Sequence, residues 1–186
     1  MIGIDEVGRG CWAGPLLVVA ARDVSALPLG LRDSKKLSKK RRESLVYDIR
    51  ISCDIGEGWV TAQEIDAVGL TAAMRLGVGR ALAMLQAQPD EAIIMDGLIN
   101  YCTPAYTNVR CLAKADDDYP VVSAASIYAK VTRDTFMSKL EEPYTSYQFG
   151  KHVGYGTALH MDMLRLYGVS DQHRLSFAPV AKFANL

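Results

Sequence analysis

Two adjacent acidic residues, Asp5 and Glu6, stand near the start of the chain and are followed by a Gly-Arg-Gly turn at residues 8–10. A carboxylate within an apolar strand needs a partner, because burying an unpaired charge is costly. The glycines leave backbone N–H and C=O groups open to a ligand, and Arg9 adds a charge suited to a phosphate. Because a ribose 2′-OH both donates and accepts hydrogen bonds, such a bare edge could also test for it.

Two further acids follow apolar segments that are typical of strands. Asp96 ends the run AIIMDG, and Asp116 follows NVRCLAK. Magnesium prefers carboxylate and water ligands and leaves positions open for phosphate oxygens. Two such ions about 4 Å apart can activate a water and stabilise a leaving oxygen in phosphodiester hydrolysis. The acids at residues 5, 6, 96 and 116 would form such a site if their strands are neighbours.

Each acid also has a structural interpretation. Asp96 precedes Gly97 in a common turn pair, and the acids at 116–118 could cap a helix that begins near Pro120. Consecutive strand residues point to opposite faces. Asp5 and Glu6 could therefore share one site only if the backbone departs from a regular strand, which the glycines of the turn permit.

Other catalytic motifs fail on their context. Residues 8–13 fit the dinucleotide fingerprint G-x-G-x-x-A, but Gly14-Pro15 and a strand pattern follow where the fingerprint requires a helix. The segment GKH at Gly150 lacks the other residues of a phosphate-binding loop. The three histidines lack the HExxH spacing of a zinc site, and the sequence has no G-x-S-x-G elbow.

Strand and helix patterns alternate along the chain and predict an α/β fold, a mixed sheet covered by helices in a single domain over 1–186. Expected strands cover 2–5, 16–22, 55–62, 92–97 and 108–114, the last two as buried strands. Expected helices cover 37–50, 69–88, 121–142 and 157–167, and a loop is expected at 143–156. Ser38 is the expected N-cap of the first helix, and a capping box at Thr61 and Glu64 predicts the start of a further short helix.

Composition limits the class of protein. The 186 residues are 49% hydrophobic and 23% charged, with a formal net charge of zero, so a nucleic-acid partner would have to meet a local patch. One candidate is RDSKKLSKKRR at 32–42, with seven cations and one acid, although charge alone favours a solvated helix start. Four cysteines without CxxC spacing predict reduced thiols, and no apolar run is long enough for a membrane span, so we expect a cytoplasmic protein.

Seven stretches together resemble bacterial ribonuclease HII. In order they are GIDEVGRG, DSKKLS, MDG, KAD, SAASIYAKVTRD, HVGYGTALH and HRLSFAPV, and they extend from Gly3 to Val180. The resemblance implies a ribonuclease H-like fold with a helical C-terminal portion. It also implies an endoribonuclease that cuts RNA in RNA–DNA hybrids and on the 5′ side of ribonucleotides embedded in duplex DNA, leaving 3′-OH and 5′-phosphate ends.

The resemblance also assigns roles to single residues. It implies catalytic and metal-binding acids for Mg²⁺ or Mn²⁺, with two ions in the catalytic state: Asp5, Glu6, Asp96 and Asp116. It implies that Gly8, Arg9 and Gly10 form a segment that senses the 2′-OH. It also implies that Tyr155 packs on the neighbouring sugar and that Lys35 contacts a phosphate. For Lys130 and Arg133, helix packing or an ion pair is an equal alternative to a functional role. The roles of His160, His173 and Arg174 stay open between structure and phosphate contact.

The chain departs from the family pattern at two positions. Ala115 stands where the family usually has glycine, so Asp117 could compete with Asp116 as a ligand, and Val153 replaces the usual lysine of HKGY.

Two other functions are alternatives to this endoribonuclease: an unselective metal-dependent nuclease and a duplex-binding protein without catalysis. We expect a monomer whose partner is a ribonucleotide-containing duplex, and a sliding clamp is a possible partner although the tail shows no clear clamp-binding motif.

Overall fold

The computed structural model describes residues 1–31 and 34–184, and for Lys35 the backbone alone. Its centre is one five-stranded sheet in the order β3-β2-β1-β4-β5. The strands are β1 (Ile2–Val7), β2 (Leu16–Asp23), β3 (Cys53–Val60), β4 (Ile93–Asp96) and β5 (Val109–Leu112). β1 pairs antiparallel with β2 and parallel with β4, so the predicted mixed sheet is confirmed.

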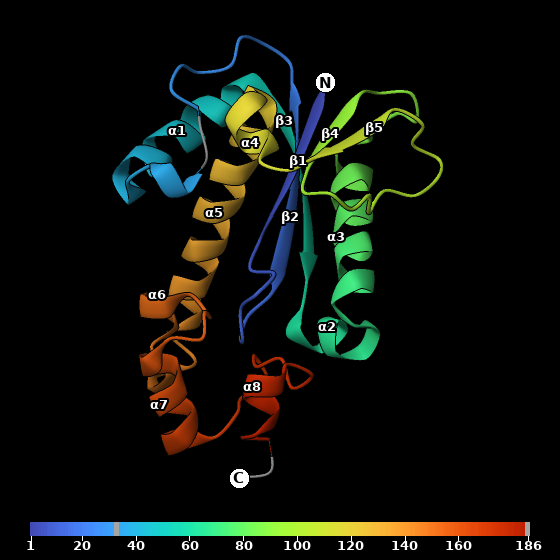
Figure 1. Ribbon diagram of the computed structural model, residues 1–186. Coiled ribbons are helices and arrows are strands. Elements are labelled where there is room, and N and C mark those ends of the chain that lie inside the picture. The colour runs from blue at the N-terminus through green and yellow to red at the C-terminus, as the bar shows by residue number, and fades with distance from the viewer. Residues whose placement is uncertain (32–33, 185–186) are drawn as a thin grey trace.

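Helices cover both faces of the sheet, as Figure 1 shows. One face carries α1 (Lys39–Ser52) and α5 (Pro120–Leu140), and the other carries α3 (Leu70–Met84), preceded by α2 (Ala62–Val68). Beyond the end of α5 lie α6 (Phe149–His152), α7 (Ala158–Tyr167) and α8 (Ala178–Ala181). The short elements are η1 (Ser34–Lys36), α4 (Ala115–Asp118) and η2 (Thr145–Tyr147).

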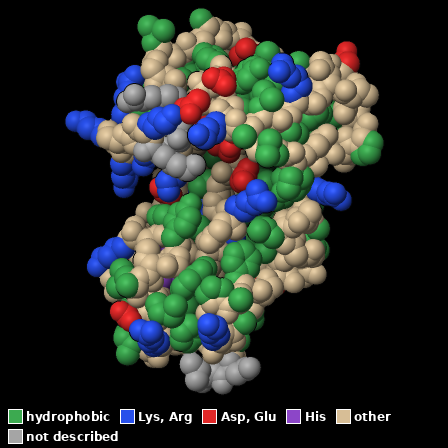
Figure 2. Space-filling model, viewed as in Figure 1, with side chains coloured by type: hydrophobic (Ala, Val, Ile, Leu, Met, Phe, Trp, Pro, Cys, Tyr) green, Lys and Arg blue, Asp and Glu red, His purple; other side chains and the backbone are tan. Residues whose placement is uncertain are grey.

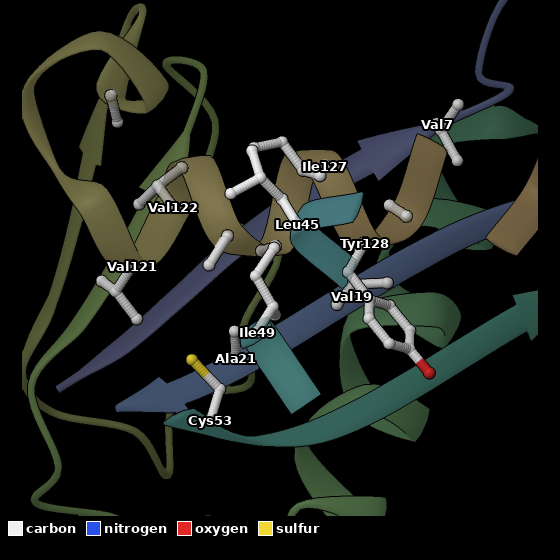
Figure 3. Close-up of a cluster of buried hydrophobic side chains, with 14 of the residues drawn as sticks. Val7, Val19, Ala21, Leu45, Ile49, Cys53, Val121, Val122, Ile127 and Tyr128 are labelled. Carbon is white, nitrogen blue, oxygen red and sulfur yellow. The ribbon is translucent and has the colours of Figure 1, made fainter. Parts of the chain in front are cut away.

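Alternation along β1 and β2 builds two hydrophobic layers, because successive strand residues face opposite sides of the sheet. Val7 and Val19 belong to the buried layer that also contains Leu45 of α1 and Ile127 of α5, and Figure 3 shows this layer. The next residue toward the start of β2, Val18, instead packs in the layer that contains α3. The sheet is therefore buried on both sides, and its central strand can carry a polar site only near a strand end.

Gly3 allows α5 to pack directly on β1. A Cβ built on Gly3 would lie 2.5 Å from the backbone carbon of Val121 in the first turn of α5, closer than real side-chain contacts. This close approach runs α5 along β1 toward the end of the strand where the acids lie. Ser126 of α5 consequently comes within hydrogen-bonding reach of Asp5.

Local signals in the sequence predicted several element boundaries correctly. Ser38 caps α1 by accepting from the backbone N–H of Arg41, and the capping box of Thr61 and Glu64 opens α2. The helix predicted over 69–88 ends earlier, at Met84, and Gln86 then adopts a φ of 52°. That conformation is incompatible with continued right-handed helix, which explains the shorter element.

Three other expectations were wrong in detail. β5 is an edge strand whose residues are half-buried or exposed, because among the described residues it pairs with β4 alone. The acids at 116–118 do not cap the helix that begins at Pro120; they form α4 themselves, and Tyr119 precedes α5 without a side-chain cap. The loop expected at 143–156 contains η2 and α6.

The cysteine expectation agrees with the structure, in which all four cysteines are free thiols. Within residues 1–31 and 34–184, no helix has the length and apolar character needed to cross a membrane.

Candidate active site

The pairing of β1 with β4 places two of the predicted acids side by side. Ile4 lies opposite Met95 in the parallel register, so Asp5 and Asp96 follow at the same edge of the sheet. The negative charge of Asp96 reaches Asp5 and contributes to raising its pKa. One cleft is lined by these two residues together with Glu6, the turn at 8–10 and Tyr155.

Asp5 is a buried acid of the cleft whose pKa is strongly raised. Its side chain is 9% exposed, and its Oδ1 accepts a hydrogen bond of 2.7 Å from the backbone N–H of Glu6. Burial first, and then the charge of Glu6, raise its pKa to about 8. A carboxyl that is so reluctant to ionise next to two other acids is a group that a bound cation would stabilise in its charged form.

Glu6 reaches the same cleft without the irregular backbone that we expected. β1 stays paired with β2 through Val7, and the left-handed backbone begins only at Gly8, with a φ of 84°. Because the cleft lies at the end of the strand, side chains from both faces of the strand can line it. A departure from the regular strand at the two acids, the condition under which the sequence let them share one site, is therefore not required.

Arg9 is held beside the acids by a residue that the sequence did not single out. Its Nη1 lies 3.4 Å from Glu6 Oε1, and its Nη2 donates to the Tyr101 hydroxyl at 3.2 Å. The guanidinium also lies 5.9 Å from the centre of the Tyr101 ring, within cation–π range. Nothing in the sequence marks Tyr101, which lies in the long connection between β4 and β5 and is buried there.

The fourth predicted acid, Asp116, lies next to this group but outside the lining of the cleft. The backbone N–H of Ala115 donates to Asp96 Oδ1 at 2.8 Å and ties the start of α4 to the end of β4. Asp116 is buried, and its carbonyl accepts from Ser123. Asp117, the alternative ligand, instead pairs with Lys36 at the surface, which favours Asp116 as the acid of the site.

The donor set suits a hard divalent cation, because the cleft gathers carboxylate oxygens whose mutual repulsion a cation would relieve. In the described part of the chain, however, no three histidine, cysteine or acidic side chains are grouped so that one ion could bind them all. Coordination by the predicted acids together therefore requires side chains to move from the positions they take here.

Tyr155 lines the same cleft as the acids. Its side chain is 39% exposed, and Lys130 Nζ lies 5.7 Å from the centre of its ring while bonding Asp134 at 2.9 Å. Burial raises the pKa of the Tyr155 hydroxyl. The ring is thus held in place at the mouth of the cleft with part of its surface open.

A chain of buried histidines supports the backbone of Tyr155. The backbone N–H of Ser170 donates to His173 Nδ1 at 2.9 Å, so a neutral His173 carries its proton on Nε2. That nitrogen lies 3.0 Å from His160 Nε2, and His160 Nδ1 lies 3.0 Å from the Tyr155 carbonyl oxygen, which can only accept. The sequence left these histidines undecided, and the structure gives them a packing and positioning role away from the acids.

This histidine chain predicts a loss of stability in acid. Burial lowers the pKa of His160 and of His173 to about 4, whereas an unfolded histidine titrates near 6.5. The unfolded chain therefore binds more protons between these values, and the free energy of unfolding falls as pH drops from about 6.5 toward 4. We expect urea midpoints measured at pH 7 and pH 5 to show this loss.

The measurement needs an Asp5→Asn background, because Asp5 titrates over an overlapping range with the opposite sign. His173→Asn is the matched comparison, since its amide oxygen can still accept from Ser170 but it has no ring to protonate. This variant should lose less stability between pH 7 and pH 5 than its parent. Equal losses in both proteins would contradict the assignment.

The basic run is partly used within the fold. Arg42 Nη1 donates to the carbonyls of Ser34 and Leu37, and Lys39 lies 3.9 Å from Glu43. Figure 2 shows Lys and Arg side chains gathered on the α1 side of the molecule, with acidic side chains between them. The side chain of Lys35 lies outside the described residues, so its phosphate contact stays a prediction. Ser34 beside it lines the cleft.

Comparison with known proteins identifies the chain. The profile of the family described as Ribonuclease HII matches residues 2–180. The chain belongs to the ribonuclease HII family. It is 42% identical over 182 residues to Ribonuclease HII of Jannaschia sp. (strain CCS1), an alignment that covers 97% of this chain and 90% of that protein.

Solved structures share the fold over nearly the whole chain. The ribonuclease H2 from Pyrococcus horikoshii OT3 matches with a TM-score of 0.81 at 26% identity, covering 99% of this chain and 96% of that one. The RNase HII from Archaeoglobus fulgidus, solved in a complex with PCNA, matches with 0.79 at 27% identity, covering 95% and 94%. The predicted ribonuclease H-like fold is confirmed, and as a ribonuclease HII family member the chain is a nuclease that hydrolyses RNA in RNA–DNA hybrids.

The two departures from the ribonuclease HII pattern have different consequences. Ala115 does not keep its loop from Asp96, because its own N–H donates to that carboxylate. Val153 adopts a φ of 44°, a left-handed conformation that is unfavourable for a β-branched side chain. Its carbonyl accepts a 2.8 Å hydrogen bond from Arg133, which helps to hold this strained turn beside Tyr155.

Proposed function

We propose that this chain cuts on the 5′ side of a ribonucleotide embedded in duplex DNA, as well as within RNA–DNA hybrids, and leaves 3′-OH and 5′-phosphate ends. One observation carries the proposal. The acids at 5, 6 and 96 line the same cleft as the bare Gly-Arg-Gly backbone and Tyr155. Groups that can act on a phosphodiester thus lie beside groups that can inspect the adjoining sugar.

Asp5, Glu6, Asp96 and Asp116 are the residues that would hold Mg²⁺ or Mn²⁺. Two such ions supply charge stabilisation at the phosphate and a water activated for attack. The raised pKa of Asp5 supports this role, because burial and the charge of Glu6 disfavour its ionised form, which a bound cation would stabilise. Arg9 lies beside Glu6 and can turn from that carboxylate to a phosphate oxygen.

The sugar would be read by backbone and by shape. Gly8 to Gly10 form one wall, and a Cβ built on Gly10 meets no atom within 4 Å, so this backbone is open to the cleft. Tyr155 offers a ring face to the sugar on the 3′ side. Neither contact reads a base, so cleavage would depend on the 2′-OH and not on sequence.

The partner is then a nucleic-acid duplex, bound by a monomer. A sliding clamp is a second candidate partner, supported by the Archaeoglobus fulgidus relative, whose structure is a complex with PCNA.

The decisive assay uses an end-labelled DNA duplex with one ribonucleotide beside an all-DNA duplex of the same sequence, each with Mg²⁺ and with EDTA. We expect a single metal-dependent cut on the 5′ side of the ribonucleotide and an intact control. Cleavage of both duplexes would identify an unselective nuclease instead. Binding of both without cleavage, under Mg²⁺ and under Mn²⁺, would identify a duplex-binding protein.

A further inference from the structure

Arg174 is a fully buried arginine that contacts the turn at the mouth of the cleft. It lies between α7 and α8 and has no exposed surface. Its Nη1 donates to the Arg9 carbonyl at 3.0 Å, and its Nε and Nη2 donate to the Gly14 carbonyl at 3.1 and 2.9 Å. Its backbone N–H donates to the Trp12 carbonyl at 2.8 Å. Arg174 thus holds the segment from Arg9 to Gly14 at three carbonyls.

The bond to Arg9 fixes the orientation of a whole peptide group. A trans peptide is planar, and its C=O and the following N–H point in opposite directions. The Arg9–Gly10 peptide is trans, and its carbonyl points inward to the buried guanidinium. The N–H of Gly10 must therefore point the other way, toward the open cleft.

The surroundings of Gly10 agree with this orientation. Gly10 is exposed and lines the cleft, and its position is open on the side where a Cβ would stand. Among residues 1–31 and 34–184, no acceptor bonds its N–H. The peptide is anchored by its carbonyl and presents a donor to whatever enters the cleft.

We propose that Arg174 is a positioning residue for ribonucleotide recognition: by holding the Arg9 carbonyl, it aims the Gly10 N–H at the 2′-oxygen of the ribose. The inference rests on the proposed function. It assigns a role to a side chain that never reaches the substrate, and it explains why the protein keeps a buried cation whose partners are backbone carbonyls.

Arg133 provides a matched comparison within the same fold. It is equally buried and donates to the carbonyls of Pro15, Val153 and Ala13 at 2.8, 2.8 and 3.2 Å. It therefore stabilises the same region and packs beside Gly8, but it bonds neither group of the Arg9–Gly10 peptide. Arg133→Lys and Arg174→Lys should cost similar stability, whereas only Arg174→Lys should release this peptide.

The test compares two binding constants that do not depend on the fraction of folded protein. One is the KM for the duplex with a single ribonucleotide, and the other is the Ki of the same all-DNA duplex as a competitive inhibitor, both with Mg²⁺. We expect the wild-type Ki to exceed KM. In Arg174→Lys the ratio of Ki to KM should fall by about threefold to tenfold, which corresponds to the free energy of one neutral hydrogen bond. The Ki itself should stay unchanged. In Arg133→Lys the ratio should equal that of wild type.

Three results would overturn the inference: a wild-type ratio of one, an unchanged ratio in Arg174→Lys, or an equal fall in both variants. The proposed function fails separately, if the wild-type protein cuts the all-DNA duplex as readily as the one with a ribonucleotide. If the wild-type protein cuts selectively but the ratio of Ki to KM does not change in Arg174→Lys, the proposed function stands and the inference about Arg174 is wrong.

A second measurement needs no variant that might misfold. Arg9–Gly10 is the one Arg-Gly pair in the sequence. Labelling arginine carbonyl carbons with ¹³C and glycine nitrogens with ¹⁵N therefore leaves a single carbonyl-correlated amide signal, that of Gly10. We expect this amide to exchange rapidly with solvent in the full-length wild-type protein, because it faces the cleft without an acceptor. Strong protection from exchange would place the N–H in the interior and overturn the inference.

Discussion

Replacing Asp96 with Asn is expected to lower the cleavage rate about a thousandfold while leaving the fold intact. Asparagine keeps the oxygen that accepts the Ala115 N–H at 2.8 Å, so the link between β4 and α4 survives. What is lost is one negative charge in the cleft and with it one of the proposed ligands for the metal ions. Several kcal/mol of charge stabilisation depend on that ligand, and about 4 kcal/mol corresponds to three orders of magnitude in rate.

The matched control is Asp117→Asn, one residue beyond the fourth acid. Asp117 pairs with Lys36 at the surface and does not line the cleft, so this change should reduce the rate less than tenfold. Single-turnover cleavage of the one-ribonucleotide duplex at saturating Mn²⁺ measures both variants, with thermal unfolding as the check on folding. An Asp96→Asn enzyme that keeps more than a tenth of wild-type activity would remove Asp96 from the site.

The sheet and its helices were predictable because local rules agreed with the packing. β1 and β2 are apolar runs bounded by Gly and Pro, and the caps at Ser38 and Thr61 mark helix starts whatever their neighbours are. β5 was misjudged because its exposure depends on its place at the sheet edge, which the sequence of one strand does not contain. The sequence likewise does not show which strands pair. The proximity of Asp5 and Asp96 could be predicted only on the assumption that β1 and β4 are neighbours.

The acids were predictable by type and position, but the residues that support them were not. Tyr101 reaches Arg9 from 92 residues away, and Arg174 reaches its carbonyl from 165 residues away. Such contacts depend on tertiary geometry and leave no periodic pattern in the sequence. The shared motifs HVGYGTALH and HRLSFAPV contain His160 and Arg174, yet a motif alone does not say that these side chains hold backbone groups.

Asp5→Asn should abolish cleavage and yet stabilise the metal-free protein at neutral and alkaline pH. The native pKa of Asp5 is raised to about 8 by burial and by Glu6, whereas its ordinary value is 3.8. Between these values the native protein holds a proton that the unfolded chain releases. The contribution of Asp5 to the free energy of unfolding is therefore lost as pH rises from about 4 to 8. Asparagine is neutral throughout, so it escapes this loss.

We expect the free energy of unfolding of Asp5→Asn to match that of wild type near pH 4. Toward pH 8 it should exceed the wild-type value increasingly, by about 2 kcal/mol or more. Asp90→Asn, at an exposed position away from the cleft, should differ by less than about 0.5 kcal/mol at every pH. Mg²⁺ or Mn²⁺ should stabilise wild type, since a ligand of the native state raises stability by mass action, and should stabilise Asp5→Asn much less. A pH-independent difference would mean that burial and Glu6 do not raise the pKa of Asp5, and equal stabilisation of both proteins by metal would mean that Asp5 is not a metal ligand. The expected result instead places the instability of the metal-free protein at the group that its catalysis needs.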